Sequence, residues 1–489
     1  MPIKKEIAMI GLFLMFILAA CSNNKSEDKS SEDNTEKEPV LKNNIELSVN
    51  EASINEEVHF TIDDLDANTD VQLEWTEVEG TYTIQNLYEF IGTEYTSKEI
   101  SLVSGTSNEE GKWEGSFKVP EGFGGDHTLF VTSDDKKIGQ KGFFVRPSFT
   151  LKPESGPVGT EVTLEVEGLG WKTYKSMWNL TYDNKYTGMV SGVSTNGKAK
   201  AVFRASGNVG KHFLSLRSGY LGSPYINHES SPHSGWPAPD FVFEVTDEAP
   251  ITDKYVEETP KAASGGVKMP DLENKKDVEV TMNKEEGIVG EKVTMKASNL
   301  PKNKEVELVW NTMKGSRVTD SGFDEESSIM DSISSDADGN AEYEFAIPDD
   351  LGGLPHRIDL KVGDEIYGQT YLRITPSIVN ISPSSGPAGT EISITIKGGG
   401  WTEYDNAYYL TYDNAYTGYM CAFNSQGTLE YKVIATGEPG YHVIDMYPGV
   451  YQQQEIETDM TLIPQLTYRE DHPGSAMPAI RYGFEVTEK

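Results

Sequence analysis

The sequence predicts an all-β protein made of tandem two-sheet modules, and three observations lead to this prediction. Segments of the sequence recur at intervals that suit modules of about 100 residues. Short stretches in which apolar and polar residues alternate follow turns rich in glycine and proline. Outside the first stretch of the chain, no segment has the sustained 3.6-residue periodicity of a helix. A chain of 489 residues is also too long for one hydrophobic core.

The start of the chain predicts an export signal over residues 1–20. Lys4 and Lys5 precede an apolar run at 7–18, and small residues then lead into Cys21. A basic start, an apolar run and small residues at the cut are typical of a signal peptide. The run is shorter than the roughly 20 residues of a membrane-spanning helix, so we expect it to be removed rather than retained.

The segment Leu-Ala-Ala-Cys that ends at Cys21 resembles the lipobox of bacterial lipoproteins. The resemblance implies that the thiol of Cys21 carries a diacylglyceryl group, which anchors the protein at the extracytoplasmic face of the cell membrane. Two acyl chains hold well, because each buried methylene contributes about 0.8 kcal/mol. A plain signal peptide with a coincidental cysteine stays open as the alternative. Residues 22–44 are polar and free of aromatic side chains, which predicts a disordered tether; the lipidated cysteine and tether span 21–44.

The composition limits the partners and the redox chemistry. The chain has 42 basic and 78 acidic residues, a formal net charge of −36, so nucleic acid is a poor partner. A cationic partner or a neutral ligand remains open. With Cys21 assigned to the anchor, Cys421 is the other cysteine, which excludes a disulfide framework. Cys421 aligns with Ser191, so we expect a small buried or half-buried residue.

The modules form a duplicated pair, in the order A–B–A′–B′. Modules B and B′ share three matching segments, which are 153–160 with 383–390, 168–171 with 398–401, and 180–188 with 410–418. Modules A and A′ match at 71–75 and 306–310. We expect module A at 45–147, module B at 148–246, module A′ at 276–376 and module B′ at 377–489. Residues 247–275, rich in proline and charge, predict a partly extended linker. Almost no residues separate A from B or A′ from B′, so we expect two stiff rods joined by one looser hinge.

The openings of modules B and B′, at 151–168 and 381–398, resemble the start of IPT/TIG domains, with the shared pattern Ser-Gly-Pro-x-Gly-Thr. The resemblance covers the first third of each module and departs where Trp171 and Trp401 replace the family's usual phenylalanine. It implies an immunoglobulin-like fold and a binding or spacing role, but no chemistry. Modules A and A′ depend on the strand pattern alone. The predicted fold is therefore four tandem immunoglobulin-like β-sandwiches.

A histidine opens a strand in every module, at His127, His212, His356 and His442. Because they recur once per module, these side chains should lie far apart rather than converge on one site. We therefore expect hydrogen-bonded structural histidines and not metal ligands or catalytic groups.

The candidate ligand-binding positions lie in two repeated Tyr-Asp-Asn elements and in two long aromatic segments, at 219–240 and 447–482. An aromatic ring beside Asp and Asn can stack on a sugar, although Asp-Asn is equally good turn chemistry. Long loops at the end of a sandwich are uncommon unless functional, and aromatic residues favour recognition surfaces. The candidate residues are Tyr182, Asp183, Asn184, Tyr186, Tyr412, Asp413, Asn414, Tyr416, Tyr225, Trp236, Tyr451 and Tyr468.

No Ser-His-Asp arrangement, phosphate-binding glycine loop or cluster of metal ligands is visible, so we expect no catalysis, no cofactor and no metal. The alternating carboxylates at 336–340 suggest a calcium loop, but the full EF-hand spacing is missing and a hairpin turn explains all four equivalent segments, so calcium stays open only as the alternative. The expected function is a lipid-anchored surface protein that binds a glycan, an envelope polymer or a protein. Alternatives are a structural spacer or accessory subunit of an envelope complex, and an envelope carbohydrate-active enzyme. The sequence does not indicate the oligomeric state.

Overall fold

The computed structural model describes residues 41, 44–85, 87, 89–172, 176–220, 222–230, 236–261, 269–316, 322–401, 407–453, 460–474 and 477–489. Residues 1–41 and 42–489 form two separate units, and the described strands all lie in the second. The predicted signal peptide, Cys21 and most of the tether lie outside the described residues. No helix in the described part of the chain is long and apolar enough to cross a membrane.

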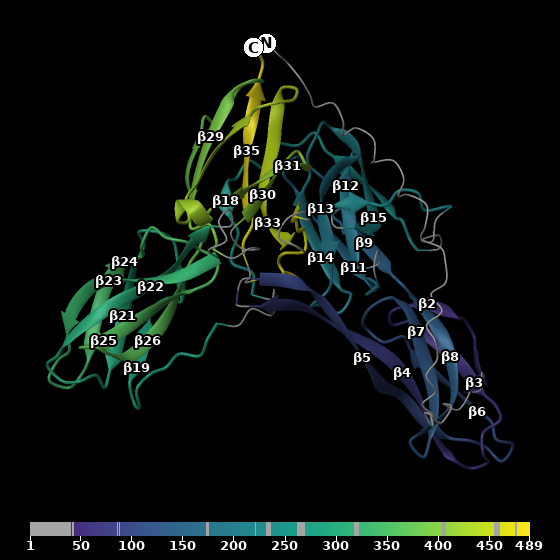
Figure 1. The fold of residues 1–489 in the computed structure, drawn as a ribbon. Helices are drawn as coiled ribbons and strands as arrows, with labels where there is room; N and C mark the ends of the chain where they lie inside the picture. Colours follow the sequence, from purple (N-terminus) through teal and green to yellow (C-terminus); the bar gives the residue numbers. More distant parts are fainter. Residues whose placement is uncertain are drawn as a thin grey trace, which may run out of the picture. The chain divides into compact units, whose positions relative to one another are not determined.

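The second unit is all-β, and its strands fall into eight sheets that pair as four sandwiches (Figure 1). Residues 45–146 form the sheets β1-β3-β6 and β2-β8-β7-β4-β5. Their strands are β1 (Ile45–Leu47), β2 (Glu51–Ser53), β3 (Glu57–Ile62), β4 (Asp70–Gln85), β5 (Glu89–Thr106), β6 (Trp113–Lys118), β7 (Gly125–Ser133) and β8 (Lys136–Arg146).

Residues 279–374 repeat the strand order of that first sandwich, in the sheets β19-β21-β24 and β20-β26-β25-β22-β23. Their strands are β19 (Glu279–Met282), β20 (Glu286–Gly287), β21 (Lys292–Ser298), β22 (Glu305–Ser316), β23 (Gly322–Ser334), β24 (Ala341–Ala346), β25 (His356–Val362) and β26 (Glu365–Ile374).

The sandwich at residues 148–245 has the sheets β14-β11-β9 and β10-β17-β15-β12-β13, with β16 beside β15. Its strands are β9 (Ser148–Lys152), β10 (Ser155–Gly156), β11 (Glu161–Glu167), β12 (Met177–Tyr182), β13 (Lys185–Ser191), β14 (Ala199–Arg204), β15 (Gly210–Tyr220), β16 (Ser223–Pro224) and β17 (Asp240–Val245).

The last sandwich has the sheets β27-β29-β32 and β18-β35-β33-β30-β31, with β28 beside β35 and β34 beside β33. Its strands are β18 (Tyr255–Val256), β27 (Ser377–Ser382), β28 (Ser385–Pro387), β29 (Glu391–Lys397), β30 (Ala407–Tyr412), β31 (Ala415–Cys421), β32 (Leu429–Ile434), β33 (Gly440–Gln453), β34 (Met460–Pro464) and β35 (Ile480–Thr487). A short 3₁₀ turn, η1 (Phe423–Ser425), precedes β32.

Each sandwich buries its own core between its two sheets, because alternate side chains along a strand point to opposite faces. In β11, Val162, Leu164 and Val166 are buried, whereas the glutamates between and beside them are exposed. They meet Leu214, Leu216 and Phe243 from the opposite sheet. A fully buried side chain of this size contributes about 1.5–3 kcal/mol, so these cores supply the stability that disulfides would give a smaller domain.

Residues 247–261 are fixed at several points, so the looser hinge expected between the module pairs is wrong. The backbone N–H of Ile251 donates to the carbonyl of Val158, 2.8 Å away in module B. Further on, β18 pairs with β35 of module B′.

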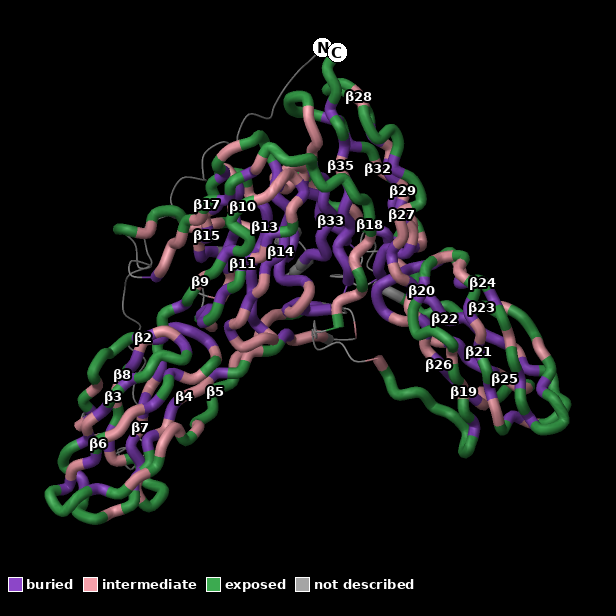
Figure 2. The backbone as a smooth tube through the Cα atoms, turned by 180° about the vertical axis from the view of Figure 1, so that it is seen from behind, coloured by how far each residue is buried: buried purple, intermediate pink, exposed green. Residues whose placement is uncertain are grey.

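The core of module B also contains side chains from module B′, which are Tyr447, Leu466, Tyr468 and Ala479. The outward sides of β13, β14 and β33 are therefore buried as well (Figure 2). Modules B and B′ form one packed body because the segment 447–482 covers strands of module B.

The expected direct contact within each pair is present, and it depends on glycine. Gly124 bridges Gly170, and Gly352 bridges Gly400 in the same way. A Cβ atom on Gly124 would lie 1.9 Å from the carbonyl oxygen of Gly168, and the corresponding distance at Gly352 is 2.0 Å. Only a residue without a side chain allows the two backbones to approach this closely.

We therefore expect Gly124→Ala to destabilise the junction of modules A and B by about 1–3 kcal/mol, the usual cost of overpacking. The measurement is the midpoint of urea unfolding of residues 42–489. Gly142→Ala is the matched control, because a Cβ atom there meets nothing within 4 Å. An equal effect of both substitutions would show that the close approach at Gly124 does not matter.

Candidate functional site

The four repeated histidines each stack on an aromatic ring of the neighbouring strand. The ring centroids lie 4.5 Å apart for Trp75 and His127, and 4.5 Å apart for Trp310 and His356. The corresponding distances are 5.4 Å for Tyr182 with His212 and 5.6 Å for Tyr412 with His442. All four modules thus contain the same stacked pair at the same place in the fold.

Both ring nitrogens of each of these histidines have hydrogen-bond partners. Nδ1 of His127 lies 2.7 Å from the carbonyl oxygen of Thr76, and Nε2 lies 2.8 Å from that of Phe123. In module B, Nδ1 of His212 lies 2.6 Å from a carboxylate oxygen of Asp183. The equivalent distance from His442 to Asp413 is 2.5 Å. The prediction of hydrogen-bonded structural histidines is confirmed.

The two Tyr-Asp-Asn elements form tight hairpin turns. The φ angles are 49° at Asp183 and 62° at Asn184, and 45° and 60° at Asp413 and Asn414. Positive φ at both central residues is the type I′ turn that Asp and Asn favour between twisted strands. The alternative of turn chemistry therefore accounts for these aspartates and asparagines.

The first tyrosine of each element does not face a ligand. Tyr182 is buried, and its hydroxyl donates to the carbonyl of Ser206 at 2.8 Å. The hydroxyl of Tyr412 donates to the carbonyl of Thr436 at the same distance. Each ring is also covered on one side by its stacked histidine. The expected stacking of Tyr182 on a sugar is therefore contradicted by its burial in the core.

The second tyrosines, Tyr186 and Tyr416, come together although they belong to different modules. Their ring centroids lie 6.4 Å apart, edge to face. Burial raises the pKa of Tyr186, and burial raises that of Tyr416 to about 12. The turn asparagines differ: Asn184 is exposed, whereas Asn414 is buried and donates to the carbonyl of Arg204 and to the hydroxyl of Ser206. The two repeats therefore meet at one contact instead of forming two separate sites.

The remaining aromatic candidates lie in different surroundings. Trp236 is buried against Trp178 and Phe144, which places it in the packing between modules A and B. Tyr468 is buried, and its hydroxyl donates to Glu257 at 2.6 Å. Tyr225 is half-buried in the segment after β16. The side chain of Tyr451 lies outside the described residues. Burial leaves Trp236 and Tyr468 unable to contact a ligand at the surface.

A buried ionic network between modules B and B′ was not predicted. Arg204 of module B lies 2.6 Å from the carboxylate of Asp445 in module B′. Arg481 lies 3.3 Å from Asp445 and 2.8 Å from Glu257. Burial alone would raise the pKa of Glu257, but the charges of Arg481 and Arg469 hold it below its ordinary value. The counterparts of Arg204, Asp445 and Arg481 in the other repeat are Ile434, Ser215 and Asp240, which cannot pair in the same way. This difference is the signal that the sequence analysis missed.

Asp471 forms a second buried connection, which joins three modules. Its carboxylate accepts hydrogen bonds from the hydroxyls of Ser191, Ser194 and Tyr82, at 2.6, 2.6 and 2.8 Å. It also accepts from the backbone N–H groups of Val193 and Ser194. Tyr82 lies near the end of the long β4–β5 hairpin of module A, beyond the four residues through which β4 pairs with β7. Module A therefore contacts module B′ as well as module B.

Cys421 is exposed, which corrects the expectation of a buried or half-buried thiol. Its counterpart Ser191 is buried because Gln465 and Asp471 of module B′ cover it. No such segment lies over Cys421 among the described residues. The alignment alone could not show this difference, because it depends on a neighbour rather than on the module.

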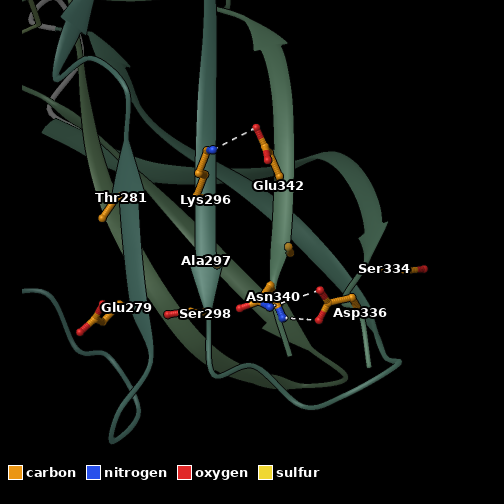
Figure 3. A pocket seen from close by; sticks show the side chains of 10 residues that line it. Glu279, Thr281, Lys296, Ala297, Ser298, Ser334, Asp336, Asn340 and Glu342 are labelled. Carbon is orange, nitrogen blue, oxygen red and sulfur yellow. Dashed lines mark hydrogen bonds and ion pairs between the residues drawn. The ribbon is translucent and has the colours of Figure 1, made fainter. Parts of the chain in front are cut away.

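Two larger surface hollows lie on module A′, and a smaller one of about 90 Å³ lies beside Tyr371 and Trp401. The hollow in Figure 3 has a volume of about 520 Å³, and no aromatic ring lines it. In it, Asp336 accepts hydrogen bonds from the backbone and side chain of Asn340, so the turn itself uses the carboxylate that suggested calcium. Among the described residues there is no group of three or more metal-ligating side chains.

The second hollow is a groove of about 780 Å³ between residues 259–261 and the sheet of module A′. Tyr371 and Arg373 project from the outward side of β26, because Leu372 and Ile374 between and beside them are buried. Thr281, Glu285 and Glu286 add hydroxyl and carboxylate groups. The hydroxyl of Tyr371 donates to the carbonyl of Pro270 at 3.0 Å, which fixes the ring. The groove thus offers one held aromatic ring beside groups of both charges.

Comparison with protein-family models finds no match, and comparison with curated proteins also finds none. Among solved structures, the Salmonella alpha-2-macroglobulin reacted with methylamine is 10% identical over 89% of this chain, with a TM-score of 0.18. This chain spans only 30% of that protein's length.

A tetra-tandem repeat from the extending region of a large adhesion protein is 10% identical, with coverage of 91% of this chain and 99% of that one and a TM-score of 0.18. A C-terminal fragment of intimin, in complex with the intimin-binding domain of the translocated intimin receptor, is 11% identical. Its coverage is 45% of this chain and 67% of that one, and its TM-score is 0.18. Similarities this low carry no argument about function.

The Asp413–His442 pair gives a pH-dependent prediction. Burial lowers the pKa of His442, but the hydrogen bond and charge of Asp413 outweigh it and raise this pKa above the ordinary 6.5. The stability from this pair is complete below the unfolded-state pKa and is lost as the pH rises through the folded-state pKa. Asp413→Asn should therefore cost about 1–2 kcal/mol near pH 5.5 and less near pH 8.5, measured by urea unfolding.

The control for this pH series is Asp338→Asn, which removes an exposed turn carboxylate of module A′. It should leave the pH dependence unchanged. A loss that is the same at both pH values for Asp413→Asn would mean that the histidine is not charged in the folded protein.

Proposed function

We propose that this protein is a lipid-anchored, extracytoplasmic surface protein that binds an envelope polymer or glycan without catalysis. Its β-sandwiches are of the immunoglobulin-like kind, duplicated as a pair, and those of B and B′ are similar to IPT/TIG domains. The anchor is the diacylated Cys21. Recognition takes place in the groove of module A′ that contains Tyr371 and Arg373.

The groove is the observation that carries this proposal. A planar ring beside hydroxyl, carboxylate and guanidinium groups is suited to a sugar, whose faces are apolar and whose edges carry hydroxyls. Tyr371 and Arg373 lie on β26, in the larger sheet of module A′. The groove is therefore formed before the ligand arrives, and less entropy is lost on binding.

Binding without catalysis fits the way in which the buried charged groups are used. Catalytic groups are usually poised at an open cleft, with few compensating partners. Here Glu257, Asp445 and Asp471 are paired inside the contact between modules B and B′, and none of them lines the groove. These carboxylates therefore stabilise the packing of modules.

The groove predicts a binding experiment with matched variants. Residues 42–489 should bind a defined polymer from isolated envelope or a glycan panel saturably, and Tyr371→Ala should weaken this binding about tenfold. Tyr371→Phe keeps the ring and should retain most of the affinity. Tyr419→Ala removes an exposed tyrosine outside the groove and should have no effect. Equal affinity of the Tyr371→Ala variant and the unaltered protein for every ligand bound would exclude the groove.

The anchor is tested separately, in cells. Cys21→Ala removes the thiol that carries the acyl groups, so incorporation of labelled palmitate should be lost and the membrane-bound fraction should fall several-fold. Cys421→Ala is the control and should leave both quantities unchanged. Palmitate that still labels the Cys21→Ala variant would contradict the assignment.

A second function is favoured by the buried ionic network. Arg204, Asp445, Arg481 and Glu257 hold modules B and B′ as one body, which suits a spacer or an accessory subunit of an envelope complex. The same binding experiment separates the two functions. Absence of binding to every polymer, with a stoichiometric protein partner recovered from mild detergent, would favour the spacer.

A further inference from the structure

The contact between modules B and B′ uses two different faces of the same fold. Module B contributes the edge formed by β13 and β14, where Met189, Ser191, Val202 and Arg204 are all buried. We call this the edge face. The edge is closed by module B′: Leu466 donates its N–H to the carbonyl of Met189 and accepts from the N–H of Val202.

Module B′ contributes the outward side of its larger sheet, which we call the sheet face. It contains the turn residue Asn414 and the strand residues Val443, Asp445 and Arg481, all of them buried. Asn414 donates to the last carbonyl of β14, that of Arg204. The contact therefore joins an edge face to a sheet face and is not symmetric.

The edge face of module B′ has no such cover in the described chain. Its residues are the counterparts Tyr419, Cys421, Lys432 and Ile434, and all four are exposed. Tyr419 is 44% exposed and Ile434 is 50% exposed. In the described residues β31 pairs only with β30, and β32 pairs only with β29. Two adjacent strand edges with exposed apolar side chains are a surface on which another chain can pair.

The sheet face of module B is also uncovered. The residues of module B at the positions of Asn414, Val443 and Gly483 are all exposed. They are Asn184, Phe213 and Val242. Phe213 and Val242 lie opposite each other on β15 and β17 and are 59% and 43% exposed. The neighbouring segment exposes Ile226 at 80%. Apolar side chains this close together on a surface indicate a contact with another protein.

The two open faces match each other in chemistry. Where the internal contact has Arg204 on the edge face, the open edge face has Ile434. Where the internal contact has Asp445 and Val443 on the sheet face, the open sheet face has Ser215 and Phe213. The Arg204–Asp445 pair is absent from both sides together, so an open edge face on an open sheet face leaves neither member of that pair buried alone. The counterpart of Arg481 is Asp240, which already lies 2.6 Å from Arg217. Lys432, the counterpart of Val202, lies 2.5 Å from Glu391.

We propose that copies of this protein associate head to tail, with the edge face of module B′ in one copy bound to the sheet face of module B in the next. In this contact Asn184 donates to the carbonyl of Ile434 as Asn414 does to that of Arg204. The partner is a second copy because, in the described residues, the buried edge face is covered by module B′ of this same chain, and each copy carries both open faces. Association is independent of ligand binding in the groove.

Such a contact is heterologous, so it can continue from copy to copy unless the rotation closes a ring. It lacks the Glu257–Arg481 pair of the internal contact and the hydrogen bonds by which Leu466 closes the edge of module B, so it should be weaker and reversible. The full sequence has a formal net charge of −36, so strongly acidic copies repel one another and added salt should strengthen association.

Sedimentation velocity of residues 42–489 tests the proposal. The mass should rise beyond the dimer as concentration and salt increase. Phe213→Asp and Ile434→Asp should each weaken association about tenfold or more, because a carboxylate would be buried without a partner. Ile329→Asp is the control, since Ile329 is 61% exposed on module A′ and belongs to neither face.

A mixture of the two variants gives the decisive result. The Phe213→Asp copy keeps its edge face and the Ile434→Asp copy keeps its sheet face, so an equal mixture should form dimers and nothing larger. Dimers in the mixture also prove that both variants are folded. A mixture that stays monomeric, with both variants folded by circular dichroism, would overturn the proposal. So would an unaltered protein that stays monomeric at about 0.1 mM in high salt, or single variants that associate as well as the unaltered chain.

Cys421 provides an independent readout, because it is the one cysteine in residues 42–489 and lies on the edge face. Its rate of alkylation by a maleimide should fall as the concentration of the unaltered protein rises. In Phe213→Asp the rate should not depend on concentration. A rate independent of concentration in the unaltered protein, under conditions where its mass increases, would place the contact elsewhere and overturn the proposal.

Discussion

The arrangement of this protein depends on burying four charged groups between two copies of one fold. Arg204, Asp445, Arg481 and Glu257 come from module B, module B′ and the segment between them. Removing such charges from water costs several kcal/mol each, and their mutual pairing offsets that cost only in a fixed geometry. If the two faces were purely apolar, one module could slide along the other. The ionic network instead allows one register, which is why residues 247–261 act as part of the body.

The modules are alike inside and differ on their outward faces. The stacked histidines show the likeness inside, since the same pair recurs in all four modules. The outward faces differ, because Arg204 stands where the other repeat has Ile434 and Asp445 stands where it has Ser215. Two identical modules would each present the same two faces. The differences decide which of these faces meet within one chain.

Residues whose environment is set inside a module could be predicted from the sequence. The alternation in β11 places Val162 and Leu164 in a core, and a histidine recurring once per module cannot be one converging site. Tyr468 and Cys421 could not be placed, because whether each is covered depends on a segment far away in the sequence. Tyr182 was misplaced although its partners Ser206 and His212 lie in its own module. Strand periodicity shows which side of a strand faces its own core. It carries no information about what covers the other side. That information lies only in the outward residues that differ between the two repeats.

The hydrogen bond from Tyr82 to Asp471 has a consequence for the order of folding. Its partners are separated by 389 residues, so it closes a loop of nearly the whole chain. A chain that is made from its N-terminus completes the β4–β5 hairpin long before Asp471. Until residues 447–482 have been made, the hairpin tip and the edge of module B lack their cover, and exposed strand edges at that stage favour wrong pairing. Slow late steps are expected of contacts this distant in sequence. The contact between the modules therefore forms only when residues 447–482 are present, and a chain that stops before them would leave the edge of module B exposed.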